Sequence, residues 1–445
     1  MSTLQPIDRR ILRLAVPALG SLAVEPIYVL VDTAIVGRLG TDQLAGLAIA
    51  ATVLSFIVAG SNFLTYGTTE RVARRLGGGD HAGAANVGVQ AMWLSLIVGL
   101  PAAPLLIFGA HRMTSLLGGS GDVLGHAETY LRVSAVGVPF ILVTLAAQGV
   151  LRGAADYTSA LWILLAANIA NVLLEMLFVY GLDWGIAGSA WATVICQIGA
   201  AIAFVVIVRP RLGDAPIRRP DRAGIAPLMT AGRHLLLRVG SMLVVFGGSA
   251  AVAARIDDQT LAAHQIVMSL FMFLALTLDA LAMPAQTLVA EELGRGDHRT
   301  AAHVARRAVR LSTLTGVALG VVLAGSARWL PRLFTSDRLV TDRATGGLWW
   351  LAAMLIPGAI AFAYDGVLIG AGDYRFLGRA ALGYLIAVIP IAIATLLTPQ
   401  LGIAGIWGGL LAWMIIRAVV NHRRTFLIVG SPPAGDIDLE RWAER

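Results

Sequence analysis

The sequence has no lysine, only one cysteine and few charged side chains of either sign. Of its 445 residues, 14% are charged and 57% are hydrophobic, whereas a soluble chain has about 25% charged residues. This deficit argues against a cytosolic enzyme, a nucleic-acid-binding module and a disordered protein. The lone Cys196 excludes a disulfide framework and a metal site built from several thiolates. Because all 34 basic residues are arginine, we attribute the missing lysine to the codon usage of a GC-rich genome.

Sequence signatures of common enzymes are missing as well. The chain has neither a His-Glu-x-x-His nor a Gly-x-Ser-x-Gly motif. The glycine-rich stretches 77–80 and 294–297 resemble phosphate-binding loops, but no lysine follows them and no strand precedes them. We therefore interpret both as tight turns between helices. We predict that the chain is not an enzyme and that it has no metal site and no cofactor beyond a coupling ion.

Long apolar runs dominate what is present, and the mean hydropathy is +0.76. A helix that crosses a membrane needs about 20 mostly apolar residues, and twelve runs reach that length. These twelve predicted helices cover 14–36, 44–70, 84–109, 123–151, 159–181, 185–208, 225–254, 261–289, 301–325, 344–368, 376–397 and 401–422. The predicted fold class is all-α, integral to the membrane.

The arginines orient these helices. With the N-terminus inside, most arginines fall in cytoplasmic segments, as the positive-inside rule requires. We therefore predict a multi-pass protein of the bacterial cytoplasmic (inner) membrane with both termini in the cytoplasm. The net charge of +7 reflects this bias and does not indicate a nucleic-acid partner.

The chain also repeats itself at one constant offset. The sequence LGGGDH at 76–81 returns as LGRGDH at 293–298, and GVLRGAADY at 149–157 returns as GVLIGAGDY at 366–374. Six helices per repeat is an even number, so both halves enter the membrane from the same side. This predicts two six-helix lobes related by a pseudo-two-fold axis along the membrane normal, a plan known from secondary transporters. The predicted domains are an N-lobe (1–208), a cytoplasmic linker (209–224), a C-lobe (225–430) and a cytoplasmic tail (431–445).

Ionisable residues inside predicted spans are candidate functional residues, because a charge in the bilayer is costly. Glu25, Tyr28 and Asp32 are spaced i, i+3 and i+7, so they share one helix face beside Pro26.

A second predicted helix carries Asn168, Asn171 and Glu175 at the same spacing, and neighbouring helices supply Tyr130 and Thr193. If these faces converge, the N-lobe holds a polar pocket in which an acid could exchange a proton or hold a sodium ion. The alternative is that these side chains only join helices by hydrogen bonds.

The second half carries its acids elsewhere. The offset of the repeat maps Asp32 to Ser249 and Glu175 to Ala392, while Asp279 and Asp365 have no acidic counterpart in the first half. This asymmetry indicates unequal roles for the halves. The alternative for Asp279 and Asp365 is again an interhelical hydrogen bond.

Several segments together resemble one transporter family. They are VDTAIVGRLG at 31–40 with LAGL at 44–47, AAHQI at 262–266, AEELG at 290–294 and DGVLIGAG at 365–372. In their order and spacing they are similar to MATE (multidrug and toxic compound extrusion) transporters, and Glu25-Pro26 before Asp32 is most similar to the DinF-like branch. The resemblance extends over nearly the whole chain.

The resemblance implies a cation-driven antiporter with twelve helices in two lobes. It implies that the cation or proton site of the N-lobe falls on Asp32, Asn171, Glu175, Tyr130 and Thr193, and we add Glu25 to this coupling set. The family usually has Asp where this chain has Glu175, so ion preference and geometry are open.

In the C-lobe, the predicted helix 225–254 lacks the acid that some branches use for sodium. We therefore predict Asp279 and Asp365 as its acids, and assign Gln265, Tyr28 and Asn168 with them to substrate contacts.

We predict an antiporter that exchanges protons, in preference to sodium, for amphipathic and cationic organic compounds, which it exports. Acids that line a pocket favour cations. We expect a monomer in the lipid bilayer with a small organic substrate. The alternative is a flippase for lipid-linked oligosaccharides built on a related fold; such proteins often carry arginine-lined central cavities, which the sequence does not predict here.

Overall fold

The computed structural model describes residues 5–213 and 215–429, and the predicted tail 431–445 lies outside them. In these two ranges the chain forms helices joined by short connections, with no strand. The helices are α1 (Pro6–Gly37), α2 (Thr41–Ser61), α3 (Phe63–Gly77), α4 (His81–Leu116), α5 (Gly121–Ala135), α6 (Val138–Gly153), α7 (Tyr157–Met176), η1 (Leu177–Gly181), α8 (Gly185–Leu212), α9 (Arg222–Ile256), α10 (Asp258–Gly294), α11 (His298–Ser326), η2 (Leu330–Leu333), α12 (Arg338–Gly370), α13 (Tyr374–Leu397), η3 (Pro399–Leu401) and α14 (Gly402–Val429).

Eleven described helices, or runs of helix, are long and apolar enough to cross a membrane, and the bent pair α5–α6 makes a twelfth if it is one span. Each span coincides with one of the twelve predicted runs. α5 and α6 meet at 51° across Val136 and Gly137, where Pro139 in the first turn of α6 cannot donate a backbone hydrogen bond. The all-α, multi-pass membrane fold is therefore confirmed.

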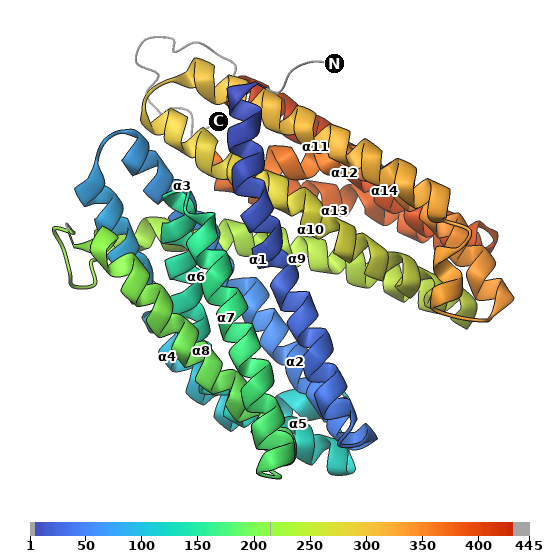
Figure 1. Ribbon diagram of the computed structural model, residues 1–445. Coiled ribbons are helices and arrows are strands. Elements are labelled where there is room, and N and C mark those ends of the chain that lie inside the picture. Colours follow the sequence, from blue (N-terminus) through green and yellow to red (C-terminus); the bar gives the residue numbers. More distant parts are fainter. Residues whose placement is uncertain (1–4, 214, 430–445) are drawn as a thin grey trace. The chain divides into compact units, whose positions relative to one another are not determined.

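The chain forms two compact units. Unit 1 consists of the described parts of Met1–Ala15 and His234–Arg445, and unit 2 consists of Val16–Arg233. The divisions fall inside α1 and α9 (Figure 1) and not in the polar segment 209–224. Buried side chains explain this, because Ile11 of α1 belongs to a core of unit 1 and Leu228 of α9 belongs to a core of unit 2.

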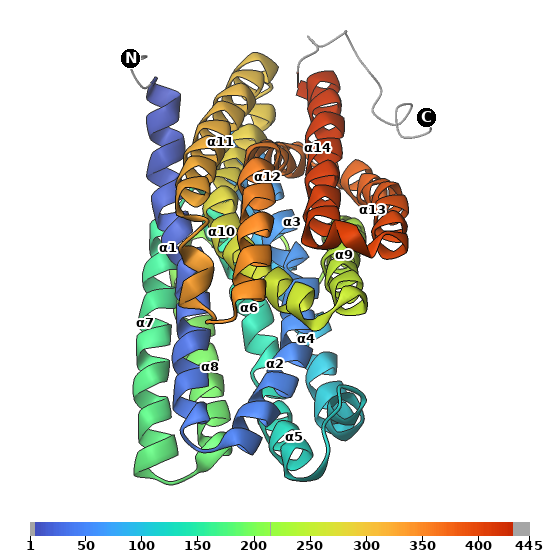
Figure 2. The ribbon, with the colours of Figure 1, turned by 90° about the vertical axis from the view of Figure 1, so that its right-hand side faces the viewer.

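In unit 2, close helix crossings depend on small residues. α6 packs on α3, and α7 and α8 lie side by side next to the 16–37 part of α1 (Figure 2). A Cβ atom on Gly149 or Gly153 of α6 would lie 2.7 Å from a side-chain atom of Thr68 or Val72 of α3. Absence of that atom lets the two backbones approach, as is common between helices in membranes.

Unit 1 contains the equivalent crossing. Gly366 and Gly370 of α12 lie against the backbone of Ala282 and Gln286 of α10. These two glycines are the counterparts of the α6 glycines in the second copy of the repeat, so the sequence repeat corresponds to a repeated close contact.

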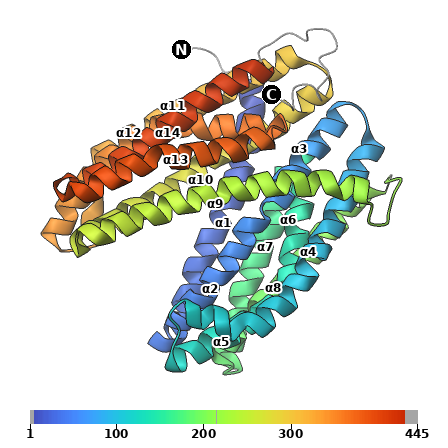
Figure 3. The same ribbon diagram turned by 180° about the vertical axis from the view of Figure 1, so that it is seen from behind.

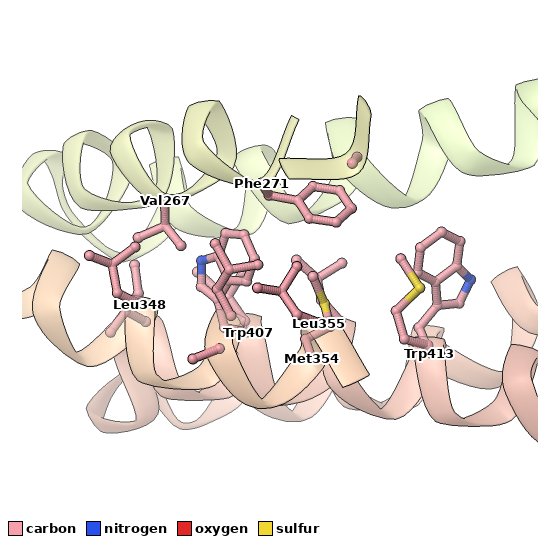
Figure 4. Close-up of a cluster of buried hydrophobic side chains, with 14 of the residues drawn as sticks. Val267, Phe271, Leu348, Met354, Leu355, Trp407 and Trp413 are labelled. Atoms are coloured by element: carbon pink, nitrogen blue, oxygen red, sulfur yellow. The ribbon is translucent and has the colours of Figure 1, made fainter. Parts of the chain in front are cut away.

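The core of unit 1 lies between α10, α12 and α14, which pack against one another (Figure 3). Its buried side chains include two tryptophans of α14. Figure 4 shows these tryptophans, Trp407 and Trp413, among Val267 and Phe271 of α10 and Leu348, Met354 and Leu355 of α12.

The glycine-rich stretches form tight turns, as predicted. Gly79 and Gly296 both have φ of +76°, a conformation that glycine adopts without steric cost. Asp80 then accepts a hydrogen bond from the Gly83 amide at the start of α4, and Asp297 accepts one from Thr300 at the start of α11. These hydrogen bonds, helped by the positive end of each helix dipole, hold the pKa of each carboxyl group below its usual value.

Candidate functional site

Asp32 lies inside unit 2 on the second half of α1. Asp32 is 6% exposed, and its Oδ1 atom accepts a hydrogen bond of 2.8 Å from the Ser189 hydroxyl of α8. The helical spacing predicted which face of α1 carries Asp32, but only the packing of α8 against that face brings Ser189 to it.

Glu175 of α7 is fully buried beside Asp32. Its carboxyl group lies close to the side chains of Asp32 and Ser189. Since Ser189 directs its one proton to Asp32, both Glu175 oxygens are left without a hydrogen bond among the described residues. No ion pair within 5–213 and 215–429 includes either acid. Two such carboxyl groups, buried together in a membrane span, require a proton or a bound cation to balance their charge.

Thr193 connects three other predicted residues to this pair. The Tyr28 hydroxyl lies 2.9 Å from Thr193 Oγ1, and the Asn171 amide donates to the same oxygen at 3.2 Å. Tyr130, which is buried, lies next to Thr193 and Ser189. The Asn171 Oδ1 atom is buried and accepts no hydrogen bond in the part of the chain that the structure describes. This polar cluster therefore contains buried oxygens of Asn171 and Glu175 that accept no hydrogen bond from the described residues.

Two residues predicted for this region lie apart from it. Glu25 is exposed on α1, and Asn168 uses its amide to donate to the Leu164 carbonyl of its own helix at 2.8 Å. The sequence predicted that Glu25 shares a helix face with Asp32, and Asn168 one with Glu175. Glu25 and Asn168 lie about two turns before these acids, outside the buried cluster around Ser189.

In unit 1, the predicted residues do not form one cluster. Gln265 is exposed on α10, and Asp279 is half-buried on the same helix. His264 is buried, 3.3 Å from the Ser249 hydroxyl and beside the Trp407 ring.

Asp365 of α12 is buried between two arginines. Its Oδ2 atom accepts hydrogen bonds from Arg238 of α9 at 2.6 Å and from Arg417 of α14 at 2.5 Å. Its Oδ1 atom accepts one from Asn421, whose own oxygen accepts from the Tyr384 hydroxyl. Asp365 is thus the counter-ion of two cations.

A family model described as MatE matches two segments of this chain, residues 17–177 and 238–394. Together these segments make up more than half of the 445 residues.

The chain belongs to the MatE family.

Relatives of known name support this assignment. Protein DETOXIFICATION 44, chloroplastic, of Arabidopsis thaliana is 30% identical over 431 residues, covering 94% of this chain and 82% of the relative. DNA damage-inducible protein F of Escherichia coli (strain K12) is 26% identical, covering 94% of this chain and 92% of the relative. A crystal structure of a MATE in the bent conformation has a TM-score of 0.89 at 21% identity and covers 96% of both chains. The resemblance to MATE transporters is therefore confirmed, and this MatE chain is a membrane transporter and not an enzyme.

The MatE chain has two arginines at a pocket that sequence reasoning missed. Arg238 and Arg417 line a narrow pocket within unit 1, whereas from the sequence we considered arginines only for a central cavity. Arg417 follows a long apolar run, so we included it among the cytoplasmic arginines that orient the helices. In the structure its side chain is instead buried, with 2% exposed. The signal that could have found it is Asn421, one turn further on α14, which marks a polar face inside a span.

Proposed function

We propose that this MatE transporter is an antiporter that takes up protons and exports amphipathic organic compounds across the cytoplasmic membrane of a bacterium. The observation that carries the proposal is the buried pair of Asp32 and Glu175, which has no basic partner among the described residues. Two acids without a basic partner bind and release a proton or cation more readily than an acid in an ion pair, because no fixed cation stabilises their ionised form.

Proximity of the two carboxyl groups supports the proton over sodium as the coupling ion. One proton shared between two adjacent carboxyl groups relieves their repulsion without any further ligand. A sodium ion would instead need several oxygen ligands around it, and the unpaired oxygens of Asn171 and Glu175 are the ones available to it. Sodium therefore remains the alternative outcome of the ion test below.

The proposed coupling acts through α1. Pro17 and Pro26 lie inside this helix, and each removes one backbone hydrogen bond, so α1 bends there at lower cost than elsewhere. Protonation of Asp32 and Glu175 weakens the hold of Ser189 on Asp32 and allows α1 to change its bend. Since α1 contributes to both units, that change is the step we propose to link proton uptake to substrate release.

The name of the Arabidopsis relative, Protein DETOXIFICATION 44, agrees with export of toxic compounds. A cationic substrate was expected because acids line a pocket. In unit 1 that support is absent, since Asp365 is bound by two arginines.

A transport assay tests the proposal. Purified protein is reconstituted in liposomes loaded with a cationic dye and, separately, an anionic dye, and a pH gradient or a sodium gradient is imposed. We expect the pH gradient to drive dye movement in the wild type and not in Asp32→Asn. The control is Asp42→Asn, which removes an exposed acid in the first turn of α2 and should keep wild-type rates.

Each other outcome has a stated meaning. Movement driven by sodium alone and lost in Asp32→Asn would replace the proton by sodium. Movement that survives in Asp32→Asn would overturn the role of the acid pair. No gradient-driven movement of either dye would favour the flippase alternative, and a lipid-linked oligosaccharide would then be the next substrate.

A further inference from the structure

The pocket of unit 1 contains charged side chains that the proton-coupling mechanism does not use. It is lined by Arg238, Arg417 and Asp365, together with six mostly apolar or aromatic residues. It has room for about one water molecule in this structure.

Two guanidinium groups of the pocket share one carboxylate. Arg238 and Arg417 approach the same oxygen of Asp365, at 2.6 Å and 2.5 Å. Asn421 occupies the other oxygen. Both arginines lie in membrane-spanning helices, where an ionised side chain is costly.

Arg417 has hydrogen-bond capacity left for a ligand. A guanidinium group has five N–H donors. One nitrogen of Arg417 donates to Asp365, and another reaches only the weak acceptor Sδ of Met414 at 3.4 Å. The side chain is 2% exposed, so bulk solvent does not reach these donors and only a molecule inside the pocket can accept from them.

An aromatic wall fixes Arg417 in place. Its guanidinium group stacks over the Trp413 ring at 4.5 Å, and Trp413 in turn meets the Phe246 ring edge-on at 5.5 Å. Met242, Leu377 and Ala381 complete an apolar lining. The side chains suit an anionic group beside arginine and an apolar body beside the wall, and the pocket must widen beyond the volume of about one water molecule to take such a ligand.

We propose that this pocket binds the carboxylate or phosphate group of an amphipathic organic anion, and that Asp365 is a resident counter-ion that the ligand partly displaces. Two converging guanidinium groups match the planar oxygens of a carboxylate or the oxygens of a phosphate. The role of this site in transport rests on the proposed function, and it replaces the cationic substrate class expected from the sequence with an anionic one.

Binding is measured by titration calorimetry on the full-length protein in lipid nanodiscs. Four probes share one phenyl ring: benzoate, phenyl phosphate, benzylammonium and benzyl alcohol. We expect heat of binding with at least one of the two anions and none with the ammonium or the alcohol. Comparing benzoate with phenyl phosphate identifies which anionic group is preferred. Binding of benzylammonium alone, or equal binding of all four probes, would overturn the proposal.

Three variants separate a binding site from a structural ion pair. Arg417→Gln should weaken binding of the anion about tenfold or more, the loss expected from one charge-assisted hydrogen bond. Arg424→Gln is the matched control. Arg424 is also on α14, pairs with the carboxylate of Asp373 and lies over the Phe376 ring, but it is not among the residues that line the pocket. It should leave binding unchanged.

Asp365→Asn has the opposite expected sign. Removing the resident carboxylate should strengthen anion binding about tenfold, whereas a purely structural pair would show no gain. Size-exclusion profiles establish that each variant is folded, and Asp365→Asn keeps the proposal testable if Arg417→Gln does not fold. Unchanged binding in Arg417→Gln, or weaker binding in folded Asp365→Asn, would overturn it.

Failure of this inference is distinguishable from failure of the proposed function. Asp32→Asn should lose transport driven by a pH gradient but keep anion binding, because Asp32 belongs to unit 2 and the pocket to unit 1. Anion binding without proton-driven transport would support the anion site and overturn the proposed antiport. Proton-driven transport without anion binding would support the antiport and overturn the anion site.

Discussion

At the scale of single residues, the chain places its buried charges in two chemically opposite settings. Asp32 and Glu175 lie close together with no ion-pair partner within the described ranges. Asp365 instead has two arginines around it. The first arrangement places two acids together without a fixed cation, whereas the second gives one acid two fixed cations. The same residue type thus has different chemistry because of the side chains that packing brings to it.

Glu175 and Glu25 should respond differently to the same substitution. Glu175→Gln should abolish dye movement driven by a pH gradient, because the buried pair then loses its exchangeable proton. Glu25→Gln should keep most of it, because Glu25 is exposed on α1 and outside the pair. Both rates are measured in the liposome assay. Loss of coupling in Glu25→Gln would return Glu25 to the coupling set predicted from the sequence.

At the scale of elements, small residues decide where helices cross. α6 on α3 and α12 on α10 are two crossings with glycines on one partner, at equivalent positions of the sequence repeat. The helix that follows α3 and the helix that follows α10 also begin alike. Asp80 caps the start of α4 and Asp297 caps the start of α11, each by accepting a backbone hydrogen bond. Thus the repeated sequence encodes repeated contacts and turns and not a repeated polar site.

Gly366→Ala should destabilise unit 1. A Cβ atom there would lie 2.3 Å from the Ala282 carbonyl oxygen, so α12 and α10 would have to separate, at a cost of about 1–3 kcal/mol. Thermal unfolding of the detergent-solubilised protein, followed by the fraction that stays monodisperse, measures the loss. The control is Gly383→Ala on α13, where no atom lies within 4 Å. Equal stability of the two variants would contradict the close crossing.

At the scale of the whole molecule, the two units share a scaffold but not a chemistry. Unit 2 holds the acid pair, and unit 1 holds the arginine-lined pocket. Because α1 and α9 each contribute to both units, the chain passes from one unit to the other within these two helices and not at the polar segment 209–224. The arginine distribution predicts that both termini lie in the cytoplasm.

Cysteine labelling tests that orientation. In a Cys196→Ser background, His81→Cys lies at the start of α4 and Ser120→Cys lies just before α5, and both native side chains are exposed. If the N-terminus is cytoplasmic, a membrane-impermeant thiol reagent added to intact cells should label Ser120→Cys only. Disrupted cells serve as the positive control for both variants. Labelling of His81→Cys in intact cells would invert the orientation.

The sequence by itself determined the spans, their number and the division of polar chemistry between the halves. Hydropathy and the internal repeat are local or periodic signals, and membrane spans follow from them because a backbone in lipid must satisfy its own hydrogen bonds. Helical spacing also placed Asp32 and Glu175 each on a helix face with polar neighbours.

Only the tertiary structure decided which side chains meet. Ser189 is 157 residues from Asp32, Arg238 is 127 from Asp365, and Arg417 is 52 from Asp365. Arginine at the end of an apolar run has the same local pattern whether it faces the cytoplasm or a buried carboxylate. What distinguishes the two is the packing of α9, α12 and α14, which depends on contacts between residues far apart in the chain and has no local sequence signal.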